Sequence, residues 1–376
     1  MRVRQLVKQE IVLIVAVVLA VLSAVWVPPD REYLAYLDFR TLAILFSLMA
    51  VMTGMRRQGV FSCLGKMLLQ RCHTTRQLVL SLVGLCFFGS MAITNDVALL
   101  TFVPFAFVVL RRLDPSLYHS LVLPVISMQT IAANLGSMAT PVGNPQNLYL
   151  YGQSGLTGWQ FVVLMLPYSL ASLLLLVGWA ILLCRTLPAD LSAVPRIAQP
   201  DGIVHRGLVC FYAVLFLVCL LAVARILPYE LAFLLVGVGI LCTRRDVLYH
   251  VDYSLLLTFI AFFLFIGNVG RIPAFSEWMA QQIAGQEVVI AVLASQCISN
   301  VPAALLLSGF TEKFMDLIVG TNLGGLGTLI ASMASLISYR QIAVEMPQEK
   351  GRYFCLFTIA NVVFLLVLLA LWYCMK

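Results

Sequence analysis

Charged residues are scarce in this chain. Asp, Glu, Lys and Arg make up 11% of its 376 residues, whereas apolar residues make up 61%. Soluble globular proteins carry about 25% charged residues. The low charge and the mean hydropathy of +0.98 therefore indicate a protein that crosses a membrane several times. A spanning helix needs about 20 apolar residues, so the chain has room for roughly ten to twelve helical elements, half-helices included.

The sequence also lacks the short motifs of common enzymes. It contains no His-Glu-x-x-His, no Gly-x-Ser-x-Gly, no Walker A loop and no Gly-x-Gly-x-x-Gly. No soluble segment is long enough for a nucleotide-binding domain. Its ten cysteines include no Cys-x-x-Cys pair, so disulfide or metal frameworks are not expected. We therefore expect neither an enzyme nor a resident cofactor.

Basic residues give the chain a net charge of +7, but they lie in short loops and form no block interleaved with aromatic residues. Nucleic acid is therefore not an expected partner. Lys and Arg concentrate in the cytoplasmic loops of membrane proteins. Placing the N-terminus in the cytoplasm puts 18 of the 24 basic residues inside. The six outside are Arg31, Arg40, Arg225, Arg271, Lys313 and Lys376. We expect a multi-pass protein of the plasma (inner) membrane with its C-terminus outside.

Two stretches rich in Gly and Asn interrupt apolar runs. The first, 134–147, contains two Gly, two Pro and three Asn, and the second is 321–328. Inside a helix, Gly costs about 1 kcal/mol and Pro about 3 kcal/mol. Irregular backbone within a bilayer is tolerated only where protein buries it or where it lines a watery cavity. We interpret both stretches as breaks in membrane helices. A polar loop outside the membrane is the alternative.

The first half of the chain follows a definite order. Residues 1–37 hold a spanning helix at about 11–27, for which a signal peptide is the less favoured interpretation. Residues 38–184 form a first repeat: a helix at 38–55, an interfacial helix within 58–76, a hairpin at 78–110, a broken helix at 117–152 and a helix at 158–184. The hairpin has short arms and basic residues at both ends, which predicts a re-entrant hairpin with the tip Thr94-Asn95-Asp96. Two plain spanning helices are the alternative.

The second half repeats that order after a polar linker at 185–206, expected in the cytoplasm. Residues 207–376 contain helices at 207–227, 229–243 and 253–270, a hairpin at 287–310 with the tip Ser299-Asn300-Val301, a broken helix at 314–339 and a last helix at 353–374. Asp38 and Asp252 are expected to cap their helices. The predicted fold is an all-α membrane protein of two inverted repeats. Gly320 and Gly324 match a helix-packing pattern, but they overlap the second break, so we expect no packing role.

Interrupted helices are typical of secondary transporters, which bind solutes where their repeats meet. A break leaves N–H groups that attract anions and carbonyl groups that can hold cations. The candidate substrate or ion site contains Thr94, Asn95, Asp96, Asn134, Gly136, Ser137, Thr140, Pro141, Gly143, Asn144, Ser299, Asn300, Thr321, Asn322, Gly324, Gly325 and Thr328. No metal site is expected, except that Asn95, Asp96 and Asn300 could hold Na⁺.

Asp96 is the only acid at either hairpin tip. An ionisable residue within a membrane suggests a function by default, because its charge is costly there. It could hold a cation or carry a proton, and the alternative is that it caps the second arm of the hairpin.

Three segments resemble the ion transporter superfamily, which contains arsenite permeases, citrate permeases, divalent-anion:sodium symporters and a group of Na⁺/H⁺ antiporters. Thr94-Asn-Asp-Val-Ala-Leu-Leu is similar to the Ala-Asn-Asp-Gly-Ala-Ala-Leu of arsenite permeases. The break at 134–147 resembles their Asn-Leu-Thr-x-Ile-Gly-x-Pro-x-Asn pattern, and 320–335 resembles their second break. The third position of each tip differs from the Ser-Asn-Thr of the symporters. The resemblance spans residues 38–376 and implies an anion permease of the citrate or arsenite type, working by alternating access as a homodimer with elevator motion.

The expected function is secondary transport of a small carboxylate or oxyanion, such as citrate, a dicarboxylate or arsenite, coupled to H⁺ or Na⁺. The expected partners are this anion, the lipid bilayer and a second copy of the chain. A Na⁺/H⁺-type cation antiporter with Asp96 as the exchanging acid is the first alternative, and a passive anion channel is the second.

Overall fold

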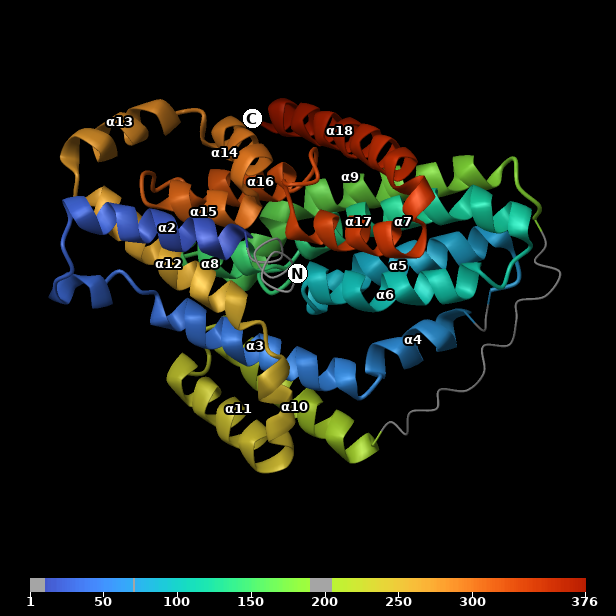
Figure 1. Ribbon diagram of the computed structural model, residues 1–376, viewed down its shortest axis with the longest axis horizontal. Coiled ribbons are helices and arrows are strands. Elements are labelled where there is room, and N and C mark those ends of the chain that lie inside the picture. The colour runs from blue at the N-terminus through green and yellow to red at the C-terminus, as the bar shows by residue number, and fades with distance from the viewer. Residues whose placement is uncertain (1–10, 70–71, 190–204) are drawn as a thin grey trace.

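The computed structural model describes residues 11–69, 72–189 and 205–376. Within these ranges the chain is all-helical, with seventeen α-helices, three short 3-10 helices and no strand (Figure 1). Seven helices are long and apolar enough to cross a membrane: Phe39–Arg57, Thr75–Ala92, Pro115–Ser137, Gly158–Cys184, Arg206–Val223, Tyr253–Gly270 and Pro347–Met375, the last including a 3-10 turn. This confirms a multi-pass membrane protein.

The elements of the first half begin with α2 (Ile11–Trp26), η1 (Arg31–Leu34), α3 (Phe39–Arg57) and α4 (Val60–Leu69). They continue with α5 (Thr75–Ala92), α6 (Asn95–Leu110), α7 (Pro115–Ser137), α8 (Pro145–Ser154) and α9 (Gly158–Cys184). Most of the linker predicted at 185–206 and the residues before 11 lie outside the described ranges.

The second half contains α10 (Arg206–Val223), α11 (Tyr229–Arg244), η2 (Arg245–His250), α12 (Tyr253–Gly270) and α13 (Pro273–Ile283). It ends with α14 (Glu287–Ile298), α15 (Asn300–Ser308), α16 (Phe314–Gly324), α17 (Met333–Glu345), η3 (Pro347–Glu349) and α18 (Lys350–Met375). The short helix α13 was not predicted from the sequence.

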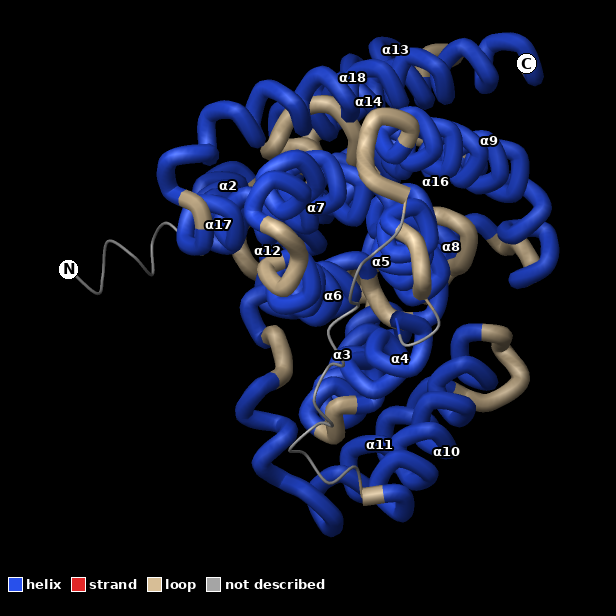
Figure 2. Tube along the Cα trace, turned by 90° about the vertical axis from the view of Figure 1, so that its right-hand side faces the viewer, coloured by secondary structure: helices blue, strands red, loops and turns tan. Residues whose placement is uncertain are grey.

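The helices α3, α10 and α11 pack together at one edge of the molecule, and α13 and α18 lie at the opposite edge (Figures 1 and 2). Between these edges, α5 and α6 pack on α7, and α14 and α15 pack on α16. Figure 1 places α5, α6 and α7 toward one end of the molecule and α14 and α15 toward the other. Helix α7 is the most deeply enclosed of the seven candidate spans, since 89% of its apolar window is buried.

Two helices cross from one half of the chain into the other. Helix α8 continues from α7 but packs against α15 and α16, whereas α17 continues from α16 but packs against α6 and α7. The segments before α8 and α17 are therefore held between the two halves.

Local sequence explains where several helices begin. The Asp38 side chain accepts a hydrogen bond from the Thr41 N–H (2.9 Å), and that of Asp252 accepts one from the Leu255 N–H (3.1 Å). Both predicted N-caps are thus confirmed. Pro145 occupies the first turn of α8, where its missing N–H costs nothing because first-turn N–H groups have no helical partner.

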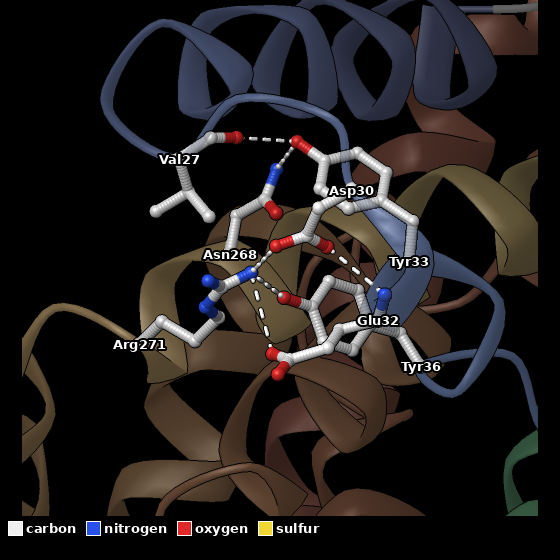
Figure 3. A network of polar contacts seen from close by, with 7 residues as sticks. All are labelled: Val27, Asp30, Glu32, Tyr33, Tyr36, Asn268 and Arg271. Carbon is white, nitrogen blue, oxygen red and sulfur yellow. Dashed lines mark hydrogen bonds and ion pairs between the residues drawn. The ribbon is translucent and has the colours of Figure 1, made fainter.

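A polar cluster fixes the connection between α2 and α3 to the end of α12 (Figure 3). The Arg271 guanidinium pairs with the carboxylates of Asp30 (2.7 Å) and Glu32 (3.4 Å). Asn268 donates to the Tyr33 hydroxyl (2.9 Å). The hydrogen bond from Arg271 lowers the pKa of the Asp30 carboxyl below its ordinary value, so the pair persists at neutral pH.

Both breaks begin later than predicted, and the first is also shorter. Helix α7 continues through Ser137, so only 138–144 is non-helical. Helix α16 continues through Gly324, and 325–332 is non-helical. The first break coincides with Thr140-Pro141, where proline removes a backbone donor and disfavours helical backbone in the residue before it.

The glycines of the second broken helix correct another prediction. A Cβ at Gly320 would lie 2.7 Å from the Ala291 Cβ, and one at Gly324 would lie 2.5 Å from the Ser295 Oγ. These distances are shorter than a van der Waals contact, so both glycines allow α16 to approach α14 closely. The packing role that we excluded from the sequence is therefore present.

Candidate functional site

Eight helix ends meet where the two breaks approach each other. Helices α5, α7, α14 and α16 end there, and α6, α8, α15 and α17 begin there. Within the described chain, the polar side chains at these ends form one hydrogen-bonded network that joins the two breaks.

Asn134, in the last turn of α7, is the first centre of this network. Its Oδ1 accepts hydrogen bonds from the Asn95 Nδ2 (3.2 Å) and from the Ser332 Oγ (3.0 Å). Its Nδ2 donates to the Gly325 carbonyl (3.4 Å). One side chain thus binds the start of α6 and both ends of the second break.

Asn322, in the last turn of α16, is the corresponding residue of the second half. Its Nδ2 donates to the Asn147 Oδ1 (2.6 Å) and to the Ile318 carbonyl (2.7 Å). Its Oδ1 accepts from the Asn144 Nδ2 (3.2 Å). Each central asparagine therefore contacts the break of the other half.

The two hairpin tips are attached to the breaks through their backbones. The Asn95 N–H donates to the Gly143 carbonyl (3.0 Å), and the Asn300 N–H donates to the Ala331 carbonyl (2.9 Å). In each case the first residue of the second arm binds a residue just before the next helix begins. This equivalence, which involves backbone and not side chains, supports the correspondence of the two halves.

The tips themselves are shorter than predicted. Helix α6 begins at Asn95, so Asn95 and Asp96 lie in its first turn. In the second tip only Ser299 is non-helical, and its φ of 75° is unusual for a residue other than glycine. Ser299 makes only long side-chain contacts of 3.5 Å, so its contribution is mainly conformational.

Further hydrogen bonds fix the shape of each break. The Thr140 Oγ1 donates to the Met91 carbonyl at the end of α5 (2.5 Å), and Ser137 accepts from the Asn144 Nδ2 (3.2 Å). In the second break, the Gln296 Nε2 donates to the Gly324 and Leu326 carbonyls (both 2.9 Å). Backbone groups that lack a helical partner are thereby satisfied without water.

Several predicted site residues have other roles. A Cβ at Gly136 would lie 2.0 Å from the Phe87 carbonyl oxygen, so this glycine packs α7 against α5. Gly324 packs α16 against α14 in the same way. Thr321 donates only to Leu317 of its own helix (2.7 Å). Thr328 is exposed and bound to Gln296, and Pro141 interrupts the helix.

Asp96 lies beside the asparagine network without joining it. Its backbone N–H donates to the Asn95 Oδ1 (2.9 Å), and Thr94 is the N-cap residue of α6. Among the described residues, no group hydrogen-bonds to the buried Asp96 Oδ1. The start of α6 therefore has no side-chain capping hydrogen bond among the described residues, although Asp96 lies in its first turn.

Three residues of the network were not among the predicted site residues. Asn147 and Ser332 contact the central asparagines, and Gln296 holds the second break. Gln296 could have been identified as the single amide in an otherwise apolar hairpin arm, and Asn147 as the last residue of the Asn-Pro-Gln-Asn motif.

Comparison with known proteins identifies a family and several relatives. A family model described as citrate transporter, CitMHS, matches residues 5–316. The inner membrane protein YbiR of Escherichia coli is 31% identical over 82% of this chain and 82% of its own length. An uncharacterized transporter of Methanocaldococcus jannaschii is 29% identical over 90% of each chain. The silicon efflux transporter LSI3 of rice (Oryza sativa subsp. japonica) is 30% identical over 38% of this chain and 28% of its own length.

The family match covers most of the chain, including α5 to α8 and the start of the second broken helix, and these elements supply most of the central network. It also places the chain among transporters and not among enzymes. This protein is a multi-pass membrane transporter that belongs to the CitMHS citrate transporter family.

Proposed function

We propose that this chain is a secondary transporter of a small carboxylate or oxyanion, and that the solute binds where the two breaks meet. The observation that carries the proposal is the reciprocal contact of the central asparagines. Asn134 binds the second break and Asn322 binds the first. A solute at this junction would contact both halves at once, as alternating access between them requires.

The helix ends favour an anion. Helices α6, α8, α15 and α17 all begin at the network, and the N-terminus of a helix carries a partial positive charge of about half a unit. Asn95, Asn134, Asn300 and Asn322 each retain 4–5% of their surface, whereas Asn147 retains none. A small displacement of the tips would therefore expose amide donors to a solute.

The arrangement of elements supports inverted repeats with re-entrant hairpins. The α5–α6 pair packs on α7 as the α14–α15 pair packs on α16, and the two pairs lie toward opposite ends of the molecule (Figure 1). In this proposal each pair enters the membrane from one side and its tip reaches the middle. The transporter works in the inner membrane as a homodimer and moves its site by elevator motion.

The substrate class follows from the same chemistry. Amide groups and helix N-termini recognise carboxylate and oxyanion oxygens without a fixed charge. The family name refers to citrate, and the name of one relative refers to silicon. We therefore place citrate, succinate, phosphate, sulfate, arsenite and silicate in one panel of candidate substrates.

Uptake by proteoliposomes containing the purified chain tests the proposal. We expect at least one anion of the panel to accumulate against its gradient when a proton or sodium gradient is imposed, and to raise the melting temperature in detergent. Asn134→Ala should abolish both effects. Coupled uptake that survives in this variant would remove the network from the site.

A cation antiporter is the second candidate, because the unpartnered Asp96 carboxylate could exchange Na⁺ for H⁺. It predicts that Na⁺ or Li⁺ alone raises the melting temperature and that no anion of the panel does. Uptake that only dissipates a gradient would instead indicate a passive channel.

A further inference from the structure

A cavity of about 300 Å³ lies next to the first turns of α6 and α15. Asp96 and Leu100 of α6 line it together with Val301 and Pro302 of α15. Helix α12 contributes Asp252, and α17 contributes Arg340. The cavity therefore adjoins both hairpin tips, although none of the central asparagines lines it.

The charges around the cavity make it suited to a carboxyl group that gains and loses a proton. Among the described residues that line it, the charged ones are Asp96, Asp252 and Arg340. The first turns of α6, α12, α15 and α17 all face it, and their N–H groups favour negative charge nearby. Arg340 adds a full positive charge. Burial and the negative charge of Asp252 act in the opposite direction and favour the protonated carboxyl, so the surroundings of Asp96 contain groups that favour each form.

Asp252 has a structural role in the fold, whereas Asp96 has none that its contacts show. Asp252 caps α12 through the Leu255 N–H (3.1 Å). Asp96 neither caps its helix nor forms an ion pair among the described residues, and its buried Oδ1 has no hydrogen-bond partner there. A buried oxygen without a partner destabilises the fold, because it has given up its hydrogen bonds to water. Packing alone therefore does not explain an aspartate at this position.

A proton fits the cavity better than Na⁺ does. Arg340 lines the same small volume, where its positive charge disfavours a metal cation, and the lining residues Val301 and Pro302 offer no side-chain oxygen. Protonation removes the negative charge of Asp96 and supplies a donor hydrogen without any further ligand.

We propose that Asp96 is the proton-carrying group of this transporter, and that the cavity bounded by Asp252 and Arg340 is the path by which its proton enters and leaves. In each cycle the Asp96 carboxylate binds one proton and later releases it to the same cavity. Asp96 lies one residue from Asn95, whose Oδ1 binds the Asp96 N–H and whose Nδ2 binds Asn134. Protonation is thereby linked to the solute site. Only this link between protonation and the solute site rests on the proposed transport function.

Carbodiimide labelling tests the proton site without any substrate. Dicyclohexylcarbodiimide reacts with protonated carboxyl groups in apolar surroundings, and mass spectrometry of the full-length protein after digestion locates the adduct. We expect labelling of Asp96 to rise as pH falls. Asp252→Asn removes a nearby negative charge and should move the midpoint to lower pH, whereas Arg340→Gln should move it to higher pH. Asn is also a good helix cap, so Asp252→Asn preserves the start of α12.

Three further substitutions serve as controls for the labelling experiment. Glu277→Gln changes an exposed acid on α13 and should leave the midpoint unchanged. Asp96→Asn should remove the adduct, and Asp96→Glu should restore it with a shifted midpoint if Asp96→Asn folds poorly. An Asp96 that reacts equally at every pH, or not at all, would overturn the proposal.

The pH dependence of transport tests whether protonation of Asp96 is coupled to anion uptake. In proteoliposomes, citrate or phosphate uptake by the native chain should change at least tenfold across two pH units, and in Asp96→Asn it should become independent of pH. Unchanged pH dependence in Asp96→Asn would refute the coupling role. If the native chain takes up no anion of the panel, the proposed function fails, while the labelling result still decides whether Asp96 exchanges protons.

Discussion

Asn322 shows how one residue can connect distant parts of the chain. Its amide binds Asn144 and Asn147, which lie about half the chain length before it in the sequence. An amide suits this position because it donates and accepts at once, and it carries no charge that the membrane would penalise. Asn134 has the same two-sided role toward Ser332 and Gly325.

Truncation of Asn322 should therefore damage both stability and transport. In Asn322→Ala, Asn144 and Asn147 each lose a partner while remaining buried, and each loss costs about 1–3 kcal/mol. We expect a clearly lower melting temperature and no uptake. Asn361→Ala is the matched control, because Asn361 is equally buried but donates only to Phe357 of its own helix (2.8 Å). If the two substitutions reduced uptake equally, the contact of Asn322 with the first break would not be needed for transport.

At the scale of helices, small residues decide how closely the hairpins approach the broken helices. Gly136 faces the Phe87 carbonyl of α5, and Gly324 faces Ser295 of α14. Apolar side chains gain little by contacting each other in a membrane, since lipid tails are equally apolar. Close packing and hydrogen bonds must therefore hold α5 on α7 and α14 on α16.

Gly136→Ala tests this packing. The added Cβ would lie 2.0 Å from a backbone oxygen, so α5 and α7 must separate, at a cost of about 1–3 kcal/mol. We expect a lower melting temperature and weaker uptake. Gly178→Ala in α9 is the control, since no atom lies within 4 Å of its new Cβ. A destabilisation in Gly178→Ala as large as that in Gly136→Ala would show that the clash is not the cause.

The sequence predicted most of the helices, because long apolar runs and capping residues are local signals. It placed the breaks too early, since Asn134 and Asn322 resemble loop residues but remain helical when their side chains find partners across the molecule. The pairing of Asn322 with Asn147 had no local signal. Helix α13 was missed because its sequence, with Glu277 and two glutamines, is neither strongly apolar nor loop-like.

At the scale of the whole molecule, ion pairs link helix ends that lie far apart in the sequence. Arg57 pairs with Asp246 (3.2 Å), and Arg111 pairs with Glu345 (2.5 Å). These four residues lie at the ends of α3, α6 and α17 and in η2. A third pair joins Lys313 and Glu287 (3.1 Å) at the starts of α16 and α14. The distribution of basic residues predicts that the first two pairs lie on the cytoplasmic side and the third on the outside.

Reporter fusions test that orientation. With the N-terminus in the cytoplasm, α18 carries the chain outward, so alkaline phosphatase fused after Lys376 should be active and a fluorescent protein there should be dark. Fusions after Glu349, which precedes α18, should give the opposite pattern because the basic Arg340 of this region favours the cytoplasm. The same reporter result at both positions would mean that α18 does not cross the membrane. The two halves would then not be inverted copies, and alternating access by their exchange would lose its basis.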